Sequence, residues 1–177
     1  MAVDTEPATR YTVSSSESSL AVEARSTLHA VRATVSGLTG YVVAAWNADG
    51  GLASTPAPAM HLEFPIDQVR SGNAMQDREM RKLVDAGRFP KVAADLRTIE
   101  LLSSPSRYKA SGEITLVGRA RTYGGEFMIA NDGGAVSVEG ELNLDIRDFG
   151  LKPPSLLILK VDPILRIRLR LVARTAA

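Results

Sequence analysis

Hydrophobic and polar residues alternate along most of the chain, a pattern typical of β-strands that bury one face. In residues 136–147, valines, leucines and an isoleucine share one face, and polar or charged residues take the other. Residues 165–171 alternate leucine or isoleucine with arginine, and residues 60–67 alternate in the same way. Weaker alternation predicts further strands at residues 20–26, 35–46, 92–102, 108–117 and 126–130.

Several of these segments run for about ten residues, which is longer than the usual strand of five or six. Long antiparallel strands with one apolar face suit a closed barrel, whose interior takes one face of every strand. Turn-forming residues separate the segments at 49–51, 103–106, 131–134 and 152–154. We therefore predict an all-β fold, an antiparallel up-and-down barrel of about eight strands. It would span residues 10–175 after a tail at residues 1–9.

One helix is predicted among the strands, at residues 73–87. Asn73 is a suitable N-cap, and Gly87 follows the last turn. A narrow apolar stripe that includes Met80 would let this helix lie against the barrel. A second, weaker helical turn is predicted at residues 27–32.

Composition narrows the chemistry that the barrel can perform. The 177 residues carry 21 Lys and Arg against 20 Asp and Glu, a net charge of +1, so overall charge gives no indication of a nucleic-acid partner. Cysteine is absent, which excludes disulfides, thiolate metal sites and thiol nucleophiles. With two histidines in the chain, we predict no metal site and no cofactor.

The first ten residues contain acids where a secretory signal peptide needs a basic start and an apolar run. No stretch of about 18 apolar residues could span a bilayer. These features predict a cytoplasmic protein without an integral membrane segment.

Catalytic signatures are missing. There is no Gly-x-Ser-x-Gly elbow, no glycine-rich phosphate loop and no His-Glu-x-x-His motif. His29 lies at a break between two strands, where a barrel mouth is expected, and its imidazole could hold a polar head group by donating and accepting hydrogen bonds. A half-buried histidine satisfied by the backbone is the alternative. His61 falls on the outward face beside Glu63, which indicates a surface role.

Two glycines, Gly112 and Gly140, fall on the apolar faces of their predicted strands. Glycine weakens a strand and usually marks a bulge, a bend or the close approach of a ligand. Because aromatic residues make up only 5% of the chain, the glycines favour a bore that side chains do not fill. Two corners of the barrel would explain them equally well.

Two further features leave alternatives open. Arg166, Arg168 and Arg170 form a basic row that could favour an anionic lipid surface or be balanced by Glu139 and Glu141 across the ladder. The consecutive apolar residues 156–159 could be a buried strand start, a homodimer contact or an apolar portal.

Motifs along nearly the whole chain, roughly residues 10–174, resemble the YceI-like family. The resemblance is carried by His29 with Gly37, by residues 64–73, 78–81 and 86–90, by Ser111-Gly-Glu-Ile-Thr-Leu-Val-Gly118 and by Asp148-Phe-Gly150. It implies an elongated, lipocalin-like barrel whose bore holds a long isoprenoid chain, such as a polyprenyl lipid or a quinone tail. The family often has a histidine where this chain has Glu79, so no role of that histidine carries over.

We therefore predict a non-enzymatic protein that binds or carries a long apolar ligand in its bore. Each buried methylene contributes about 0.8 kcal/mol, so a long tail binds without many polar contacts. One alternative is a cofactor-independent enzyme that uses His29 as an acid or base. Another is a structural barrel with a filled bore.

The predicted ligand-binding residues share the inward face of the strands, with His29 at the polar end. For residues 35–46 this choice is ambiguous, because Leu38, Val42 and Trp46 form a face that rivals Tyr41. The inward residues are Val22, Tyr41, Met60, Leu62, Phe64, Leu96, Gly112, Ile114, Phe127, Gly140, Leu142, Leu144 and Ile167.

Overall fold

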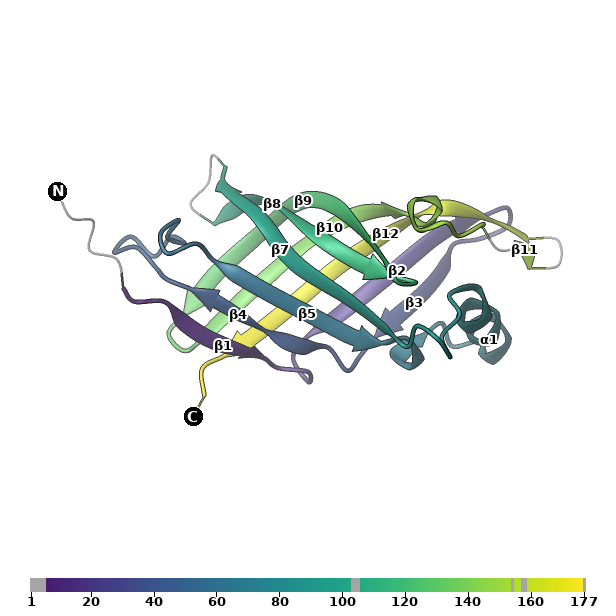
Figure 1. Ribbon diagram of the computed structural model, residues 1–177, viewed down its shortest axis with the longest axis horizontal. Helices are drawn as coiled ribbons and strands as arrows, with labels where there is room; N and C mark the ends of the chain where they lie inside the picture. Colours follow the sequence, from purple (N-terminus) through teal and green to yellow (C-terminus); the bar gives the residue numbers. More distant parts are fainter. Residues whose placement is uncertain (1–5, 103–105, 154, 157–158, 177) are drawn as a thin grey trace.

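The chain folds into an elongated antiparallel barrel (Figure 1). The computed structural model describes residues 6–102, 106–153, 155–156 and 159–176. Its helical elements are η1 (Ile66–Gln68), α1 (Ala74–Leu83) and η2 (Ile146–Phe149). Its strands are β1 (Thr9–Val13), β2 (Ser19–Ser26), β3 (Val31–Val35), β4 (Thr39–Ala44), β5 (Ala59–Pro65), β6 (Val69–Arg70), β7 (Lys91–Leu101), β8 (Arg107–Leu116), β9 (Arg119–Asp132), β10 (Ala135–Asp145), β11 (Ser155–Leu156) and β12 (Leu159–Arg174).

Eight strands close the barrel, in the order β1, β4, β5, β7, β8, β9, β10 and β12. Strand β12 pairs with β10 from Ile164 to Arg174, and its last residues also pair with β1, which completes the ring. The predicted all-β antiparallel barrel of about eight strands is confirmed.

Beyond this ring the sheet splits at one end. Strand β2 pairs with β12 between Val161 and Arg170, β3 pairs with β2, and β6 pairs with β3 alone. The β5–β7 ladder ends at Pro65 and Lys91, so β6 and β7 are not joined. Helix α1 lies at this end, which we call the α1 end, together with the β2–β3 connection, η2 and β11 (Figure 1). The start of β1 and the end of β12 lie at the opposite end.

The predicted helix at residues 73–87 is present as α1. The side chain of Asn73 caps it by accepting hydrogen bonds from the backbone N–H groups of Met75 and Gln76, at 3.0 and 3.2 Å. Turn residues follow from residue 84. Among the described residues, no helix is long and apolar enough to cross a bilayer.

The helical turn predicted at residues 27–32 is wrong. Residues 27–29 form a bend, and β3 begins at Val31. The reason is that the backbone N–H of Thr27 donates to the carbonyl oxygen of Lys160 at 3.2 Å, and its hydroxyl accepts from the Lys160 N–H at 3.3 Å. These groups are therefore tied to β12 instead of to a helical turn.

Residues 156–159, predicted as a strand start, a dimer contact or a portal, fall largely outside the described residues. Strand β11 ends at Leu156 and β12 begins at Leu159, and the two strands pair at these positions.

Candidate ligand-binding cavity

The barrel encloses an elongated cavity of about 370 Å³ that is partly open to solvent. This volume falls in the range of about 300–1,000 Å³ that is typical of small-molecule sites. Strands β2 to β10 contribute together with β12 and α1, and most lining side chains are aliphatic or aromatic. The cavity therefore offers an apolar environment along the barrel axis.

The exposure of inward-facing residues along β12 shows where the barrel is hollow. Leu171 and Ala173 are fully buried, whereas Leu165, Ile167 and Leu169 are only half-buried although they lie on the same inward face. In a filled core these side chains would have no accessible surface, because protein interiors pack as densely as organic crystals. The empty space therefore lies in the middle of the barrel and extends toward the α1 end.

The opposite end, which we call the closed end, is filled by aromatic side chains. The buried indole N–H of Trp46 donates to the Tyr11 hydroxyl at 3.0 Å. The Tyr108 hydroxyl accepts from the backbone N–H of Leu52 at 2.9 Å, and Leu52 itself bridges back to Trp46. These hydrogen bonds satisfy the polar atoms of the aromatic side chains that fill this end, so burying them costs little free energy.

Helix α1 covers the cavity at the other end. Met80 and Leu83 line the cavity, yet no residue of α1 is fully buried. Gln76 and Glu79 of α1 line it too, as does Asp162 near the start of β12. Since charged groups are costly to bury in an apolar space, these residues mark the mouth of the cavity.

Most of the predicted inward residues line this cavity. Neither His29 nor Tyr41 does. The residues that the structure brings together are Val22, Met60, Leu62, Phe64, Leu96, Gly112, Ile114, Phe127, Gly140, Leu142, Leu144 and Ile167.

The prediction that Tyr41 faces inward is wrong. The Arg10 guanidinium lies over its ring at 3.9 Å, and the His61 ring stacks on it at 5.9 Å, both on the outside of the barrel. The rival face is the inner one, because Leu38, Val42 and Trp46 are buried. Aromatic Tyr41 is stable outside since Arg10 and His61 cover its faces.

The expectation that His29 forms the polar end of the site is not supported by its position. His29 is exposed in the β2–β3 connection, and its Nδ1 lies 3.1 Å from the Ala30 carbonyl oxygen. Its backbone N–H is held by the Ser26 hydroxyl at 3.2 Å. The backbone thus satisfies this histidine, and α1 supplies the polar groups of the mouth instead.

Gly112 and Gly140 line the cavity without creating its empty space. A Cβ atom at Gly112 would lie 2.8 Å from the Asp95 carbonyl oxygen, beside a register shift in β7. A Cβ atom at Gly140 would meet the Phe127 ring and lie 2.6 Å from the Glu126 carbonyl oxygen. Both glycines therefore allow close approach within the barrel wall, and the Phe127 ring occupies the space at Gly140.

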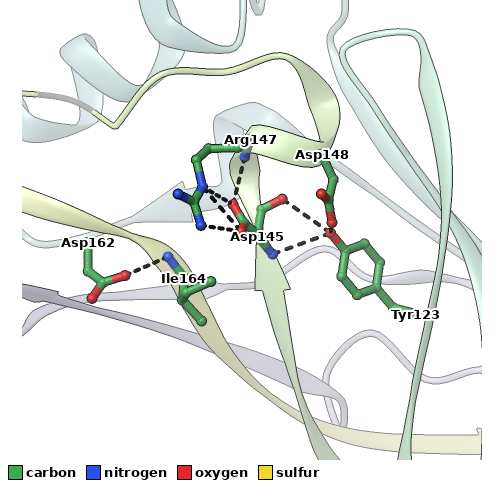
Figure 2. Close-up of polar contacts among 6 residues, drawn as sticks. All are labelled: Tyr123, Asp145, Arg147, Asp148, Asp162 and Ile164. Atoms are coloured by element: carbon green, nitrogen blue, oxygen red, sulfur yellow. Dashed lines mark hydrogen bonds and ion pairs between the residues drawn. The ribbon is translucent and has the colours of Figure 1, made fainter.

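Tyr123 fixes η2 at the α1 end of the barrel (Figure 2). Its hydroxyl donates to the Asp148 carboxylate and accepts from the backbone N–H of Asp145 at 3.3 Å. Burial, aided by the hydrogen bond to Asp148, raises the pKa of Tyr123 to about 12. Its ring stacks on Phe149, which belongs to η2 and is buried together with Ile146. The hydroxyl is thus engaged by the protein, and these contacts hold the segment Asp148-Phe-Gly150 beside the mouth.

The basic row on β12 faces outward, and glutamates of β10 balance it. Arg166 and Arg168 contact Glu141 at 2.9 and 3.4 Å, and Arg170 lies 3.7 Å from Glu139. The balanced ladder is therefore the correct alternative. Pairs this exposed add little to stability.

His61 bridges two carboxylates on the outer surface. Its Nδ1 lies 2.7 Å from Asp95 and its Nε2 lies 3.3 Å from Glu63. The hydrogen bond to Asp95, assisted by Glu63, raises the pKa of His61 against the opposing effect of partial burial. This cluster lies on the outer face of β5 and β7, away from the cavity.

The raised pKa predicts a pH-dependent contribution of His61 to stability. Because protonation is favoured in the folded state, this contribution is full below the unfolded pKa, about 6.5, and is lost as pH rises through the folded pKa. We expect His61→Gln to be less stable than the parent protein at about pH 5.5 and closer to it at about pH 8.5 in urea unfolding. His29→Gln is the control, because that ring contacts a backbone carbonyl instead of a carboxylate. An equal difference at both pH values would contradict the ion-pair interpretation.

The comparisons with known proteins agree with this architecture. The model of the YceI-like domain matches residues 11–173, nearly the whole barrel. The chain belongs to the YceI-like family. No protein with a curated description matches it in sequence.

Several solved structures share the fold. BcnA from Burkholderia cenocepacia aligns with a TM-score of 0.76 at 16% identity, over 91% of this chain and 99% of BcnA. A polyisoprenoid-binding domain from Saccharophagus degradans, implicated in plant cell wall breakdown, aligns with a TM-score of 0.70 at 12% identity, over 94% of this chain and 98% of that domain. The YceI protein of Campylobacter jejuni aligns with a TM-score of 0.65 at 11% identity, over 83% and 86% of the two chains. At such identities the likeness shows the fold alone.

Proposed function

We propose that this protein binds a long apolar ligand of the isoprenoid type inside the barrel and does not convert it chemically. The observation that carries the proposal is the row of half-buried inward residues on β12, Leu165, Ile167 and Leu169, between a filled closed end and the mouth at α1. Leaving apolar side chains beside empty space forfeits packing energy. A ligand that fills the bore recovers it.

The shape of the cavity favours a long, narrow ligand. Its lining extends from Trp46 and Leu52 at the closed end to Met80 of α1 at the mouth. Each methylene that enters contributes about 0.8 kcal/mol, so affinity grows with the length of chain that fits. A polar head would remain at the mouth, beside Gln76, Glu79 and Asp162.

The isoprenoid class is supported by the family. The Saccharophagus degradans domain with the same fold is a polyisoprenoid-binding domain. Branched methyl groups at regular intervals also suit a wall made of leucine, isoleucine and valine, because interlocking shapes maximise dispersion contacts.

The polar residues of the lining support binding over catalysis. Asp77 accepts hydrogen bonds from the Ser71 backbone N–H at 2.9 Å and from its hydroxyl at 2.6 Å. Glu79 pairs with Lys82 at 3.3 Å, and Asp162 accepts from the backbone N–H of Ile164 at 2.8 Å (Figure 2). A general acid or base needs to reach a substrate proton. These carboxylates are instead committed to local structure.

The direct test uses protein that has been stripped of lipid by denaturation and refolding. A C20 prenyl alcohol, geranylgeraniol, should raise the melting temperature increasingly with concentration, because it binds the native state alone. The five-carbon prenol is the control and should leave the melting temperature unchanged at equal concentration, since it buries too few methylenes. No shift with geranylgeraniol, a quinone or a long-chain fatty acid would contradict the proposal. Turnover of the bound alcohol into a new product would contradict the non-catalytic part.

A further inference from the structure

Positive charge is concentrated at the α1 end of the barrel. Several cations there form no ion pair with any residue that the structure describes, and most are exposed. They come from β2, from β6 and α1, and from the segments around β11. They are Arg25, Arg70, Arg78, Arg81, Lys152 and Lys160.

Acidic groups at this end offset these cations only in part, because residues 23–32, 66–88, 117–121 and 145–162 contain twelve Lys and Arg against eight Asp and Glu. Asp77 accepts from Ser71, and Asp148 accepts from the Tyr123 hydroxyl. Asp145 pairs with Arg147 at 2.7 Å. At the closed end, by contrast, Arg107 is paired with Glu126 at 2.7 Å. The near-neutral chain thus carries an excess of free cations at one end.

Two large apolar side chains are exposed at the same end, one in the β2–β3 connection and one in α1. Leu28 is 69% exposed in the β2–β3 connection, and Met75 is 67% exposed in the first turn of α1. Figure 1 shows the β2–β3 connection and α1 at the same end of the barrel. Binding to a lipid surface grows with the apolar area that enters it and with attraction between cations and anionic headgroups, and this end offers both.

We propose that the α1 end docks on a bilayer surface that contains anionic lipids. The cations would lie near the lipid phosphates while Leu28 and Met75 enter the boundary between headgroups and acyl chains. A protein partner fits less well, because stable protein interfaces need a contiguous packed patch. Anionic lipids need only positive charge within about a Debye length, whichever element supplies it. The proposal goes beyond the ligand of the bore and does not depend on it.

Co-sedimentation with vesicles tests the electrostatic part. The protein should bind vesicles of phosphatidylcholine with phosphatidylglycerol, bind vesicles of phosphatidylcholine alone much less, and dissociate as salt is added. Arg25→Gln combined with Arg78→Gln should weaken binding about 25-fold, because each cation near an anionic surface contributes roughly a fivefold gain. The control, Arg107→Gln with Lys109→Gln, has the same net charge but changes the closed end. It should stay within about twofold of the parent protein.

A second pair of variants tests the apolar part. Leu28→Ser should weaken binding to the anionic vesicles by roughly tenfold, since a partly inserted leucine loses most of its transfer free energy. Leu101→Ser is matched in residue type and exposure, at 60%, but lies at the closed end and should have no effect. All six substituted residues of these variants are exposed, and circular dichroism checks the folding of each variant.

Three results would overturn the docking proposal. They are equal losses in the α1-end and closed-end variants, equal binding to neutral and anionic vesicles, and no binding to vesicles of either composition. The last would leave an acidic protein surface as the occupant of this end. Measuring geranylgeraniol binding by the same variants in solution keeps this outcome separate from that of the bore.

Discussion

Replacing Ala94 by Phe is expected to abolish binding of a long apolar ligand while the barrel keeps its stability. Ala94 lies on β7, pairs with Leu62 on β5 and with Ile114 on β8, and lines the cavity. A phenyl group there would enter the hollow and occupy the path of the ligand. Affinity for geranylgeraniol should fall by at least about tenfold, while unfolding free energy stays constant or rises by about 0.5–2 kcal/mol, as cavity-filling changes do.

Ala173→Phe is the matched control at the closed end. Ala173 has no exposed surface and belongs to the packed core around Trp46. The same added volume has no space there and should cost about 1–3 kcal/mol or more. Urea unfolding and ligand titration of both variants separate the two cases. If Ala94→Phe destabilises as much as Ala173→Phe, the bore is filled and the barrel is structural.

The inward faces of most strands could be predicted because charge marks the outward face. On β12, arginines at every second position leave only one face that can be buried, and the glutamates of β10 fix the partner face in the same way. On β4 this marker is missing. Tyr41 and Val42 are both compatible with burial, and the choice depends on Arg10 of β1 and His61 of β5, which are distant in sequence.

The closure of the barrel could not be predicted from local signals. Strand β1 is five residues long and carries no clear alternation, and its place follows from pairing with β4 and with the end of β12. The split between β6 and β7 likewise depends on where Pro65 ends the β5–β7 ladder. Long-range register of this kind has no signature within a single segment.

The sequence predicts His29 at the mouth of the cavity because that residue lies at a strand break. The break does lie at the α1 end, but the backbone bonds of Ser26 and Ala30 hold His29 on the surface. The groups at the mouth, Gln76 and Glu79, belong to a helix whose apolar stripe was visible in sequence. The sequence does not show which strands that helix covers, because this depends on the split in the sheet.

The second large effect is expected at Gly140, where even a single methyl group should destabilise the barrel. An alanine Cβ would collide with the Phe127 ring and lie 2.6 Å from the Glu126 carbonyl oxygen. Gly140 is the direct cross-strand partner of Phe127, so the ring lies on a surface that only glycine provides. Neither the ring nor the carbonyl can move without disturbing the β9–β10 ladder. We expect Gly140→Ala to cost about 1–3 kcal/mol in urea unfolding.

A double-mutant cycle separates the ring from the backbone. If Phe127 causes most of the strain, Gly140→Ala should cost much less in a Phe127→Ala background, with a coupling of about 0.5–3 kcal/mol. Gly87→Ala is the control, because nothing lies within 4 Å of a Cβ at Gly87. It should be neutral or slightly stabilising, since alanine restricts the unfolded chain. Parent-like stability of Gly140→Ala would contradict this arrangement: the Phe127 ring would then not rest on Gly140, and the space there would belong to the bore and its ligand.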